Sequence, residues 1–269
     1  MALTFNTDVG SKILSNHLNK ITKEIELNTY RLTTGKKLSQ DDPAGYVMVQ
    51  RLNNQISSSE IGLKNVQMAQ SELTYREETL TSINASLQSA LDALKGFSSA
   101  TDDNAKQALI DNAKTAIQAA TQLKSSAEFN GKDLYTTPAD KTINLGDGSS
   151  ITIDKSVLGV TISTAGIDNL SITNNSSLNQ VITNLENSIR ANTGNISGLG
   201  AYNNMLSSTA DNITSKIQAY ESTIDTISSV DVATETAKLT QNQILQQVTA
   251  ALLSQQSSSA YLALSLITG

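Results

Sequence analysis

The side chains that could do chemistry are few and scattered along the chain. His17 is the single histidine and there is no cysteine, which excludes multi-histidine metal sites, thiolate nucleophiles and cysteine-ligated zinc. A Ser-His-Asp site would have to use His17. Its neighbours Leu14, Leu18 and Ile21 have helical spacing, which favours an ordinary histidine on a helix.

Three other patterns could suggest a site, and each has a simpler interpretation. The glycine-rich segment 194–200 has no preceding strand and lacks the Gly-x-Gly-x-x-Gly order of a dinucleotide loop. Asp147-Gly148 with Asp154 lacks the ligand spacing of a calcium loop and is typical of a turn. The pairs at 77–78 and 102–103 are most simply solvated helix charge and a helix N-cap. We therefore predict no catalytic residue, no cofactor, no metal site and no enzyme.

Charge and composition exclude further classes. The chain has 19 Lys+Arg against 25 Asp+Glu, a formal net charge of −6. Without clusters of basic residues it is a poor candidate for binding nucleic acid or an anionic membrane. Its apolar runs are too short for a membrane-spanning helix, and its first residues lack the basic and apolar regions of a general secretory signal peptide. Aromatic residues make up 4%, which favours thin helix-to-helix packing over a thick globular core.

Heptad spacing of apolar residues predicts long paired helices. Three segments, about 44–100, 104–127 and 178–227, place apolar residues at alternating steps of three and four, the pattern of a coiled coil. The exceptions in the two long segments are Arg76, Asn192 and Asn203. We predict a rod domain over 43–227 whose core contains Val66, Leu73, Leu80, Ile83, Leu87, Leu94, Leu185, Ile189, Ile196, Leu206, Ile213, Ile217 and Ile224. Asp42 and Pro43 should start its first helix as N-cap and first helical residue.

Residues 128–175 change character between the helices. Segments 142–145 and 151–153 alternate apolar and polar residues around Asp147-Gly148, which predicts a β-hairpin. Segments 160–162 and 170–172 are candidates for further short strands. The predicted fold class is thus all-α with a small β part: long antiparallel coiled-coil helices, with a short β-hairpin region at the tip of the rod.

Both chain ends are amphipathic helices that lack a partner of their own. We predict an N-terminal helix with its connection over 1–42 and a C-terminal helix over 228–269, paired with each other or with copies in neighbouring chains, because a lone amphipathic helix is marginal in water. The predicted assembly interface consists of Leu14, Leu18, Ile21, Ile25, Leu32, Ile244, Leu245, Val248, Leu252, Leu253, Leu264 and Leu266.

Several segments together resemble the bacterial flagellins. Residues 31–45, RLTTGKKLSQDDPAG, resemble the family's RLSSG…DDAAG, and Glu128-Phe129-Asn130-Gly131 contains its FNG. Residues 199–204, LGAYNN, resemble LGAxxNR. Residues 230–247 resemble DVDxAxE…LT…QILQQ, and 264–267 resemble the closing LSLL. These matches follow the family's order and cover about 200 residues, with both terminal regions among them.

The resemblance implies an extracellular subunit that polymerises into the flagellar filament for swimming motility. It implies ends that are disordered in the single subunit and fold on assembly. The implied partners are further copies of the chain, an export chaperone at the C-terminal helix, and hook-associated and cap proteins. It also implies export by the flagellar type III system without a cleaved signal peptide, and O-glycosylation at sites the sequence does not identify.

Two departures from the family pattern matter. Only about 50 residues separate the helices, so we expect no large variable outer domain. Ser89 and Leu91 stand where many flagellins carry the arginines of LQRxRELAVQ, so we expect weak recognition by the innate receptor for flagellin. The alternatives are a hook–filament junction protein of the same superfamily and a secreted coiled-coil adhesin.

Overall fold

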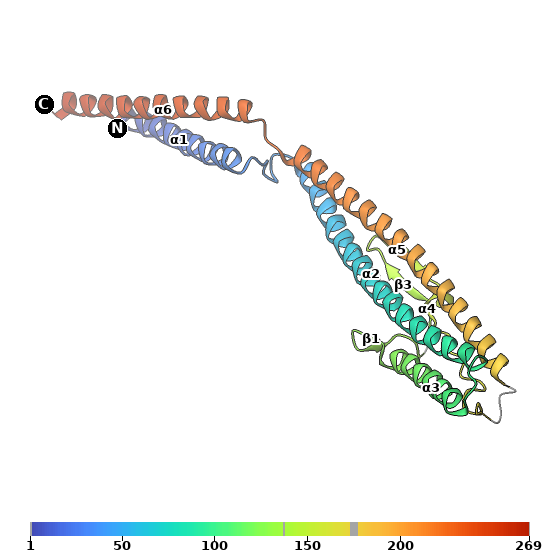
Figure 1. Ribbon diagram of the computed structural model, residues 1–269. Coiled ribbons are helices and arrows are strands. Elements are labelled where there is room, and N and C mark those ends of the chain that lie inside the picture. Colours follow the sequence, from blue (N-terminus) through green and yellow to red (C-terminus); the bar gives the residue numbers. More distant parts are fainter. Residues whose placement is uncertain (1, 137, 173–176, 269) are drawn as a thin grey trace. The chain divides into compact units, whose positions relative to one another are not determined.

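The computed structural model describes the backbone of residues 2–136, 138–172 and 177–268, and side chains from 9 to 258 within those ranges. The chain divides into two units. Met1–Asn53 with Tyr220–Gly269 forms the first, and Asn54–Ala219 the second. The helices are α1 Ala2–Thr34, α2 Pro43–Phe97, α3 Asp103–Ser126, the short α4 Lys155–Leu158, α5 Leu178–Ser228 and α6 Val232–Thr268. The strands are β1 Glu128–Phe129, β2 Lys132–Asp133, β3 Lys141–Asn144 and β4 Ser150–Ile153. This confirms the predicted fold class, mainly helical with a small antiparallel β part (Figure 1).

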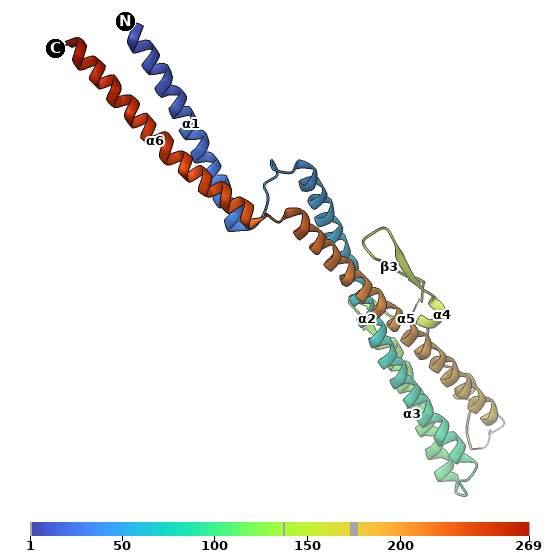
Figure 2. The same cartoon turned by 90° about the horizontal axis from the view of Figure 1, so that it is seen from above.

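The second unit is built on two long helices whose apolar faces meet. In both views α5 runs alongside α2 in the opposite direction, and α3 lies beside the later part of α2 (Figure 2). One cluster of buried residues joins α2, α3 and the start of α5, and a second joins α2, α5 and the β region. Of the expected core residues, the structure buries Val66, Leu73, Leu80, Ile83, Leu87, Leu94, Leu185, Leu206 and Ile213. Ile189, Ile196 and Ile217 are partly buried against these clusters, and Ile224 is half-buried in the first unit.

The β3–β4 hairpin lies directly on the backbone of α2. Its strands pair in the register Asn144↔Ser150, with Asp147 and Gly148 in the connecting loop, as the alternation predicted. Gly146 has φ +83°, and a Cβ atom there would lie 1.8 Å from the carbonyl oxygen of Ser58. A side chain at Gly62 would meet the carbonyl of Leu145. The two glycines therefore permit a backbone-to-backbone contact that no other residue type would allow.

Arg76, the exception in the first apolar pattern, joins α2 to the β region. Its guanidinium pairs with Glu72 at 3.1 Å and donates to the carbonyl oxygens of Leu134 at 2.6 Å and Leu158 at 3.0 Å. It also lies over the ring of Tyr135, whose hydroxyl donates to the Arg76 carbonyl. Arg76 is 7% exposed, so this buried charge supplies hydrogen bonds that an apolar residue could not.

The predicted strands at 160–162 and 170–172 are wrong. The first segment is extended, but polar side chains of α5 take the place of a partner strand. Asn192 accepts from the Thr161 amide and donates to its carbonyl, Ser188 accepts from the Ser163 amide, and Asn195 donates to the Gly159 carbonyl. Asn192, an exception in the long apolar pattern, is fully buried by this contact. In the second segment a tight turn from Ile167 to Leu170 places both side chains in the core.

We expect Arg76→Leu to lower the free energy of unfolding by about 3 kcal/mol or more, because it removes one partner of a buried ion pair and leaves two carbonyls without a donor. The matched control is Lys95→Leu, whose ion pair with Glu186 is exposed and should contribute less than about 1 kcal/mol. Chemical denaturation followed by circular dichroism measures both. Equal losses would contradict the role given to Arg76.

Candidate assembly surface

Helices α1 and α6 pack against each other along the first unit. They lie side by side and antiparallel (Figure 2). Gln246 donates to the hydroxyl of Thr22 at 3.2 Å, and Gln256 lies over Gly10, where a Cβ atom would come within 2.2 Å of its amide nitrogen. The two terminal helices, over residues 2–34 and 232–268, are therefore paired with each other in the single chain, as the predicted fold class has it.

α1 brings the apolar side of this contact. Leu14, Leu18, Ile25 and Leu32 are half-buried and Ile21 is 5% exposed, so the structure places all five on the side that faces α6. Asn28 continues the same spacing and is 2% exposed. Burial of these apolar side chains stabilises the pair by roughly 25 cal/mol per Å².

α6 brings a mostly polar side to the same contact. Among the α6 side chains that the structure describes, up to Ser258, the protected positions are Glu235, Leu239, Asn242, Gln246, Thr249, Leu253 and Gln256, at alternating steps of four and three. Two of these seven are leucines, and the others carry amide, hydroxyl or carboxylate groups. Hydrogen bonding therefore determines which side of α6 meets α1 as much as hydrophobic burial does.

Four aliphatic residues of α6 lie on a different side and are exposed. Ile244 is 56% exposed, Leu245 39%, Val248 49% and Leu252 52%. We call these four residues the α6 apolar face. The sequence grouped them with Leu253, which the structure places against α1 instead. Leu264 and Leu266 lie outside the residues whose side chains the structure describes.

A third side of α6 is polar and uncharged. Gln243, Gln247 and Ser254 are exposed there, about 100° or more around the helix axis from the centre of the α6 apolar face at 100° per residue. After Lys238 the helix contains no charged residue. Over the described part of α6, to residue 258, the apolar face is thus the side that lacks both a partner helix and groups that water can solvate well.

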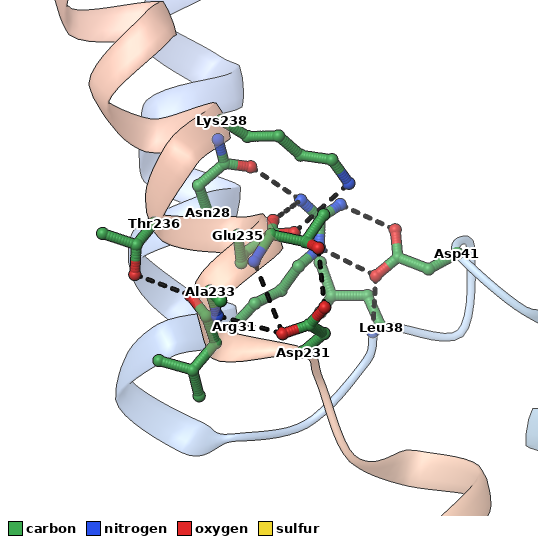
Figure 3. A network of polar contacts seen from close by, with 11 residues as sticks. Asn28, Arg31, Leu38, Asp41, Asp231, Ala233, Glu235, Thr236 and Lys238 are labelled. Atoms are coloured by element: carbon green, nitrogen blue, oxygen red, sulfur yellow. Dashed lines mark hydrogen bonds and ion pairs between the residues drawn. The ribbon is translucent and has the colours of Figure 1, made fainter.

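A polar network ties the base of α1 to α6 and to the connection that follows α1 (Figure 3). Arg31 donates through Nε and Nη2 to the carboxylate of Asp41 at 2.8 and 2.6 Å. Its Nη1 donates to Asn28 and to Glu235, both at 2.8 Å. Glu235 is 4% exposed and also accepts from Lys238. Hydrogen bonds from Arg31 lower the pKa of the Asp41 carboxyl, and the same bonds raise the pKa of Arg31.

The two connecting segments are held to each other. The Lys37 amide donates to the Ser228 carbonyl at 2.7 Å and the Val230 amide to the Gly35 carbonyl at 3.0 Å. Gly35 has φ +68°, which lets the chain turn out of α1. On the other side of the connection, Asp42 accepts from the Gly45 amide and α2 begins at Pro43, as predicted.

The sequence did not identify the Arg31 network as a site. Arg31 was noted only as part of segment 31–45, and Glu235 only as part of segment 230–247, both of which resemble flagellin motifs. The available signal was the position of Asn28, a polar residue within an apolar pattern, three residues before Arg31.

His17 is exposed on α1. Within the described residues, no group of three or more His, Asp or Glu could hold a metal ion. No helix in that part has the length and hydropathy needed to cross a bilayer.

The fold and this surface define a class of structural protein: helical, with paired chain ends and an uncovered apolar face. Comparison with known proteins identifies the family. The N-terminal helical region of bacterial flagellin matches residues 5–138, and the C-terminal helical region matches residues 181–266. The chain belongs to the bacterial flagellin family, which confirms the resemblance found in the sequence.

Relatives of two sizes match the chain. The flagellar filament 30.7 kDa core protein of Treponema maltophilum is 25% identical, with 99% of this chain and 100% of that protein covered. Listeria monocytogenes flagellin is 26% identical, with 93% and 94% covered. By contrast, the B-type flagellin of Pseudomonas aeruginosa is 28% identical over 62% of this chain and 35% of its own length. The chain thus spans about a third of the length of such larger relatives.

The fold is also similar to that of solved structures. A putative flagellar hook-associated protein from Vibrio parahaemolyticus superposes with a TM-score of 0.51 and 12% sequence identity, covering 71% of this chain and 97% of that one. At this identity the likeness shows the fold alone.

We expect acid to weaken the attachment of the α1 base. Because Arg31 lowers the Asp41 pKa in the folded chain, the stabilisation is complete above the unfolded value of about 3.9 and is lost as the pH falls through the folded value. Arg31→Gln should remove it at neutral pH and cost about 1.5–3 kcal/mol, since Glu235 keeps a buried charge with one partner fewer.

Hydrogen exchange of the α1 amides near Arg31, read by mass spectrometry, measures this effect. Lys20→Gln, an exposed change on the same helix, is the control and should leave exchange unchanged. The assignment is wrong if Arg31→Gln exchanges like the unchanged chain at neutral pH.

Proposed function

We propose that this chain is a structural subunit that polymerises into the bacterial flagellar filament. Family membership and the full-length match to a filament core protein of Treponema maltophilum support this function. The subunit performs no chemistry. It contributes to swimming motility as one repeat of a stiff helical polymer outside the cell.

The observation that carries the proposal is the α6 apolar face. Four neighbouring aliphatic side chains are between 39% and 56% exposed, although the partner helix α1 is already in place. Covering them would gain roughly 25 cal/mol per Å². A second copy of the chain would cover this face. When a patch on one copy contacts a different patch on the next, and the rotation between copies does not close a ring, the result is an open helical polymer.

The mechanical behaviour of the polymer would follow from the same contacts. Helices that pack through narrow patterns of side chains have alternative packings separated by small shifts. If neighbouring subunits adopt two such packings, the polymer curves. A curved, stiff polymer turned at its base acts as a propeller.

Export and partners form the finer part of the proposal. The subunit would leave the cell through the flagellar type III system, without a cleaved signal peptide. An export chaperone would cover the C-terminal helix, since an exposed apolar face promotes aggregation before assembly. Hook-associated and cap proteins would contact the first and last subunits. Further copies of the chain remain the main partner.

A hook–filament junction protein is the second candidate. The fold shared with a hook-associated protein favours it. Such a protein would share the helical ends but act in few copies. Electron microscopy of the pure chain separates the two, because only a filament subunit makes long filaments alone. A secreted coiled-coil adhesin would make none.

Ile244→Ser combined with Val248→Ser should abolish polymerisation of the pure chain, because it replaces the apolar centre of the proposed contact with hydroxyls. The matched control is Gln243→Ser with Gln247→Ser on the polar side of the same helix, which should still polymerise. Both variants should keep the circular dichroism of the unchanged chain. Sedimentation and negative-stain microscopy measure assembly, and filaments from the first variant would refute the mechanism.

We also expect weak activation of the innate receptor for flagellin. Leu91 is 4% exposed and belongs to the core, while Ser89 donates to the Ala85 carbonyl of its own helix. Neither can offer the guanidinium that the family motif carries at these positions. A reporter-cell assay against an arginine-bearing flagellin tests this, and equal activation would overturn it.

A further inference from the structure

The turn of the β1–β2 hairpin is formed by the one Asn-Gly pair of the sequence. Glu128↔Asp133 and Phe129↔Lys132 are paired, which leaves Asn130 and Gly131 as a two-residue turn. Their φ angles are +52° and +73°, as in the mirror-image turn that favours Asn-Gly. Both residues are exposed.

From this geometry we infer that Asn130 is a site of spontaneous deamidation, selective within this chain, that converts its amide to a carboxylate. The backbone nitrogen of Gly131 attacks Cγ of Asn130 and forms a carbon–nitrogen bond. The bond from Cγ to Nδ2 breaks, and ammonia leaves with the proton that the Gly131 amide gives up. Water then opens the five-membered imide at either carbonyl, leaving aspartate or isoaspartate. One water is consumed, one ammonia is released, and no redox partner is needed.

Three features of the turn make the reaction possible. Within the described residues no hydrogen bond holds the side chain of Asn130. Gly131 has no side chain to obstruct the attack, and the nearest atom to a Cβ placed there would be a Glu128 oxygen at 3.8 Å. The strands are two residues long, so little structure must open for the turn to reach the reactive conformation.

The β3–β4 loop contains an Asp-Gly pair, which is protected. Asp147 precedes Gly148, but its carboxylate accepts from the Ser149 amide at 3.0 Å and from Lys216 at 3.1 Å. The Ser149 hydroxyl also donates to this carboxylate. The Ser149 hydroxyl, the Ser149 amide and Lys216, in that order, lower the Asp147 pKa, and the ionised carboxylate resists attack by a backbone nitrogen. Asn144 is likewise held, since its side-chain oxygen accepts from the Gly146 amide at 2.8 Å.

Asparagines within the helices are protected by a different constraint. Beyond the first turn of a helix, the amide of the following residue donates to a carbonyl in the preceding turn, so its nitrogen is not available. Outside the helices, Asn169 precedes Leu170, whose amide donates to the Ile167 carbonyl. Asn104, in the first turn of α3, precedes Ala105, whose amide donates to the Asp102 carboxylate. Among the described asparagines, Asn130 is the one followed by glycine, so we expect it to be the reactive one.

Modification would alter the contact between the hairpin and α2. Isoaspartate adds one backbone atom to a two-residue turn, so the Phe129↔Lys132 register could not be kept. Phe129 lies 6.4 Å from Tyr75 by ring centroid, and the next segment supplies the Leu134 carbonyl that Arg76 binds. We expect slow ageing to loosen this part of the second unit.

The test is ageing of the folded full chain in neutral and mildly alkaline buffer, followed by peptide mapping with electron-transfer mass spectrometry. We expect conversion at Asn130, faster in alkali, to exceed that at every other described asparagine at least tenfold, with isoaspartate among the products. Asn130→Gln should abolish it, because the longer side chain forms the larger ring slowly.

The same chain unfolded in denaturant provides the reference. If the denatured chain is modified at Asn130 while the folded chain is not, the hairpin protects the site and the inference is wrong. It is equally wrong if folded chains convert elsewhere at the same rate. Neither result depends on whether the chain polymerises, so this inference and the proposed function can fail separately.

Discussion

The contact between α1 and α6 is the constraint on which the rest of the first unit depends. α1 meets its partner with leucines and isoleucines, whereas five of the seven protected positions on the described part of α6 are polar. A helix can face one partner with one side only. Because hydrogen bonds at Thr22, Arg31 and Glu235 fix which side of α6 that is, the aliphatic residues Ile244 and Val248 are left uncovered.

Polar groups in this contact make the α1–α6 pair less stable than apolar residues would, but they define its register. An apolar pattern alone would allow α6 to rotate or slide along α1. In coiled coils, buried polar residues prevent such shifts. Here the Arg31 network fixes one end and the pair Gly10 and Gln256 fixes the register farther along. The second unit uses the same device, since Arg76 and Asn192 interrupt apolar patterns and fix the β region and the 159–165 segment to the helices.

Periodicity predicted the helices to within a few residues, because a long apolar repeat has few alternative structures. It could not predict which side of α6 meets α1, since Leu252 and Leu253 are equally apolar and the choice depends on hydrogen bonds with a helix over 200 residues away in sequence. The strand expected at 160–162 failed for a related reason. Its alternation fits an extended chain, but the backbone partners came from α5 side chains. The Arg31 network escaped notice because no local pattern links residues 31, 41 and 235.

The account depends on one claim, that the aliphatic side chains left outside the α1–α6 pair are buried only between copies of the chain. Cryo-electron microscopy of the polymer formed by the pure protein tests this most directly. The account predicts a helical polymer in which Ile244, Leu245, Val248 and Leu252 each pack against a neighbouring subunit. A polymer in which these four side chains face solvent, held together by other surfaces, would contradict it.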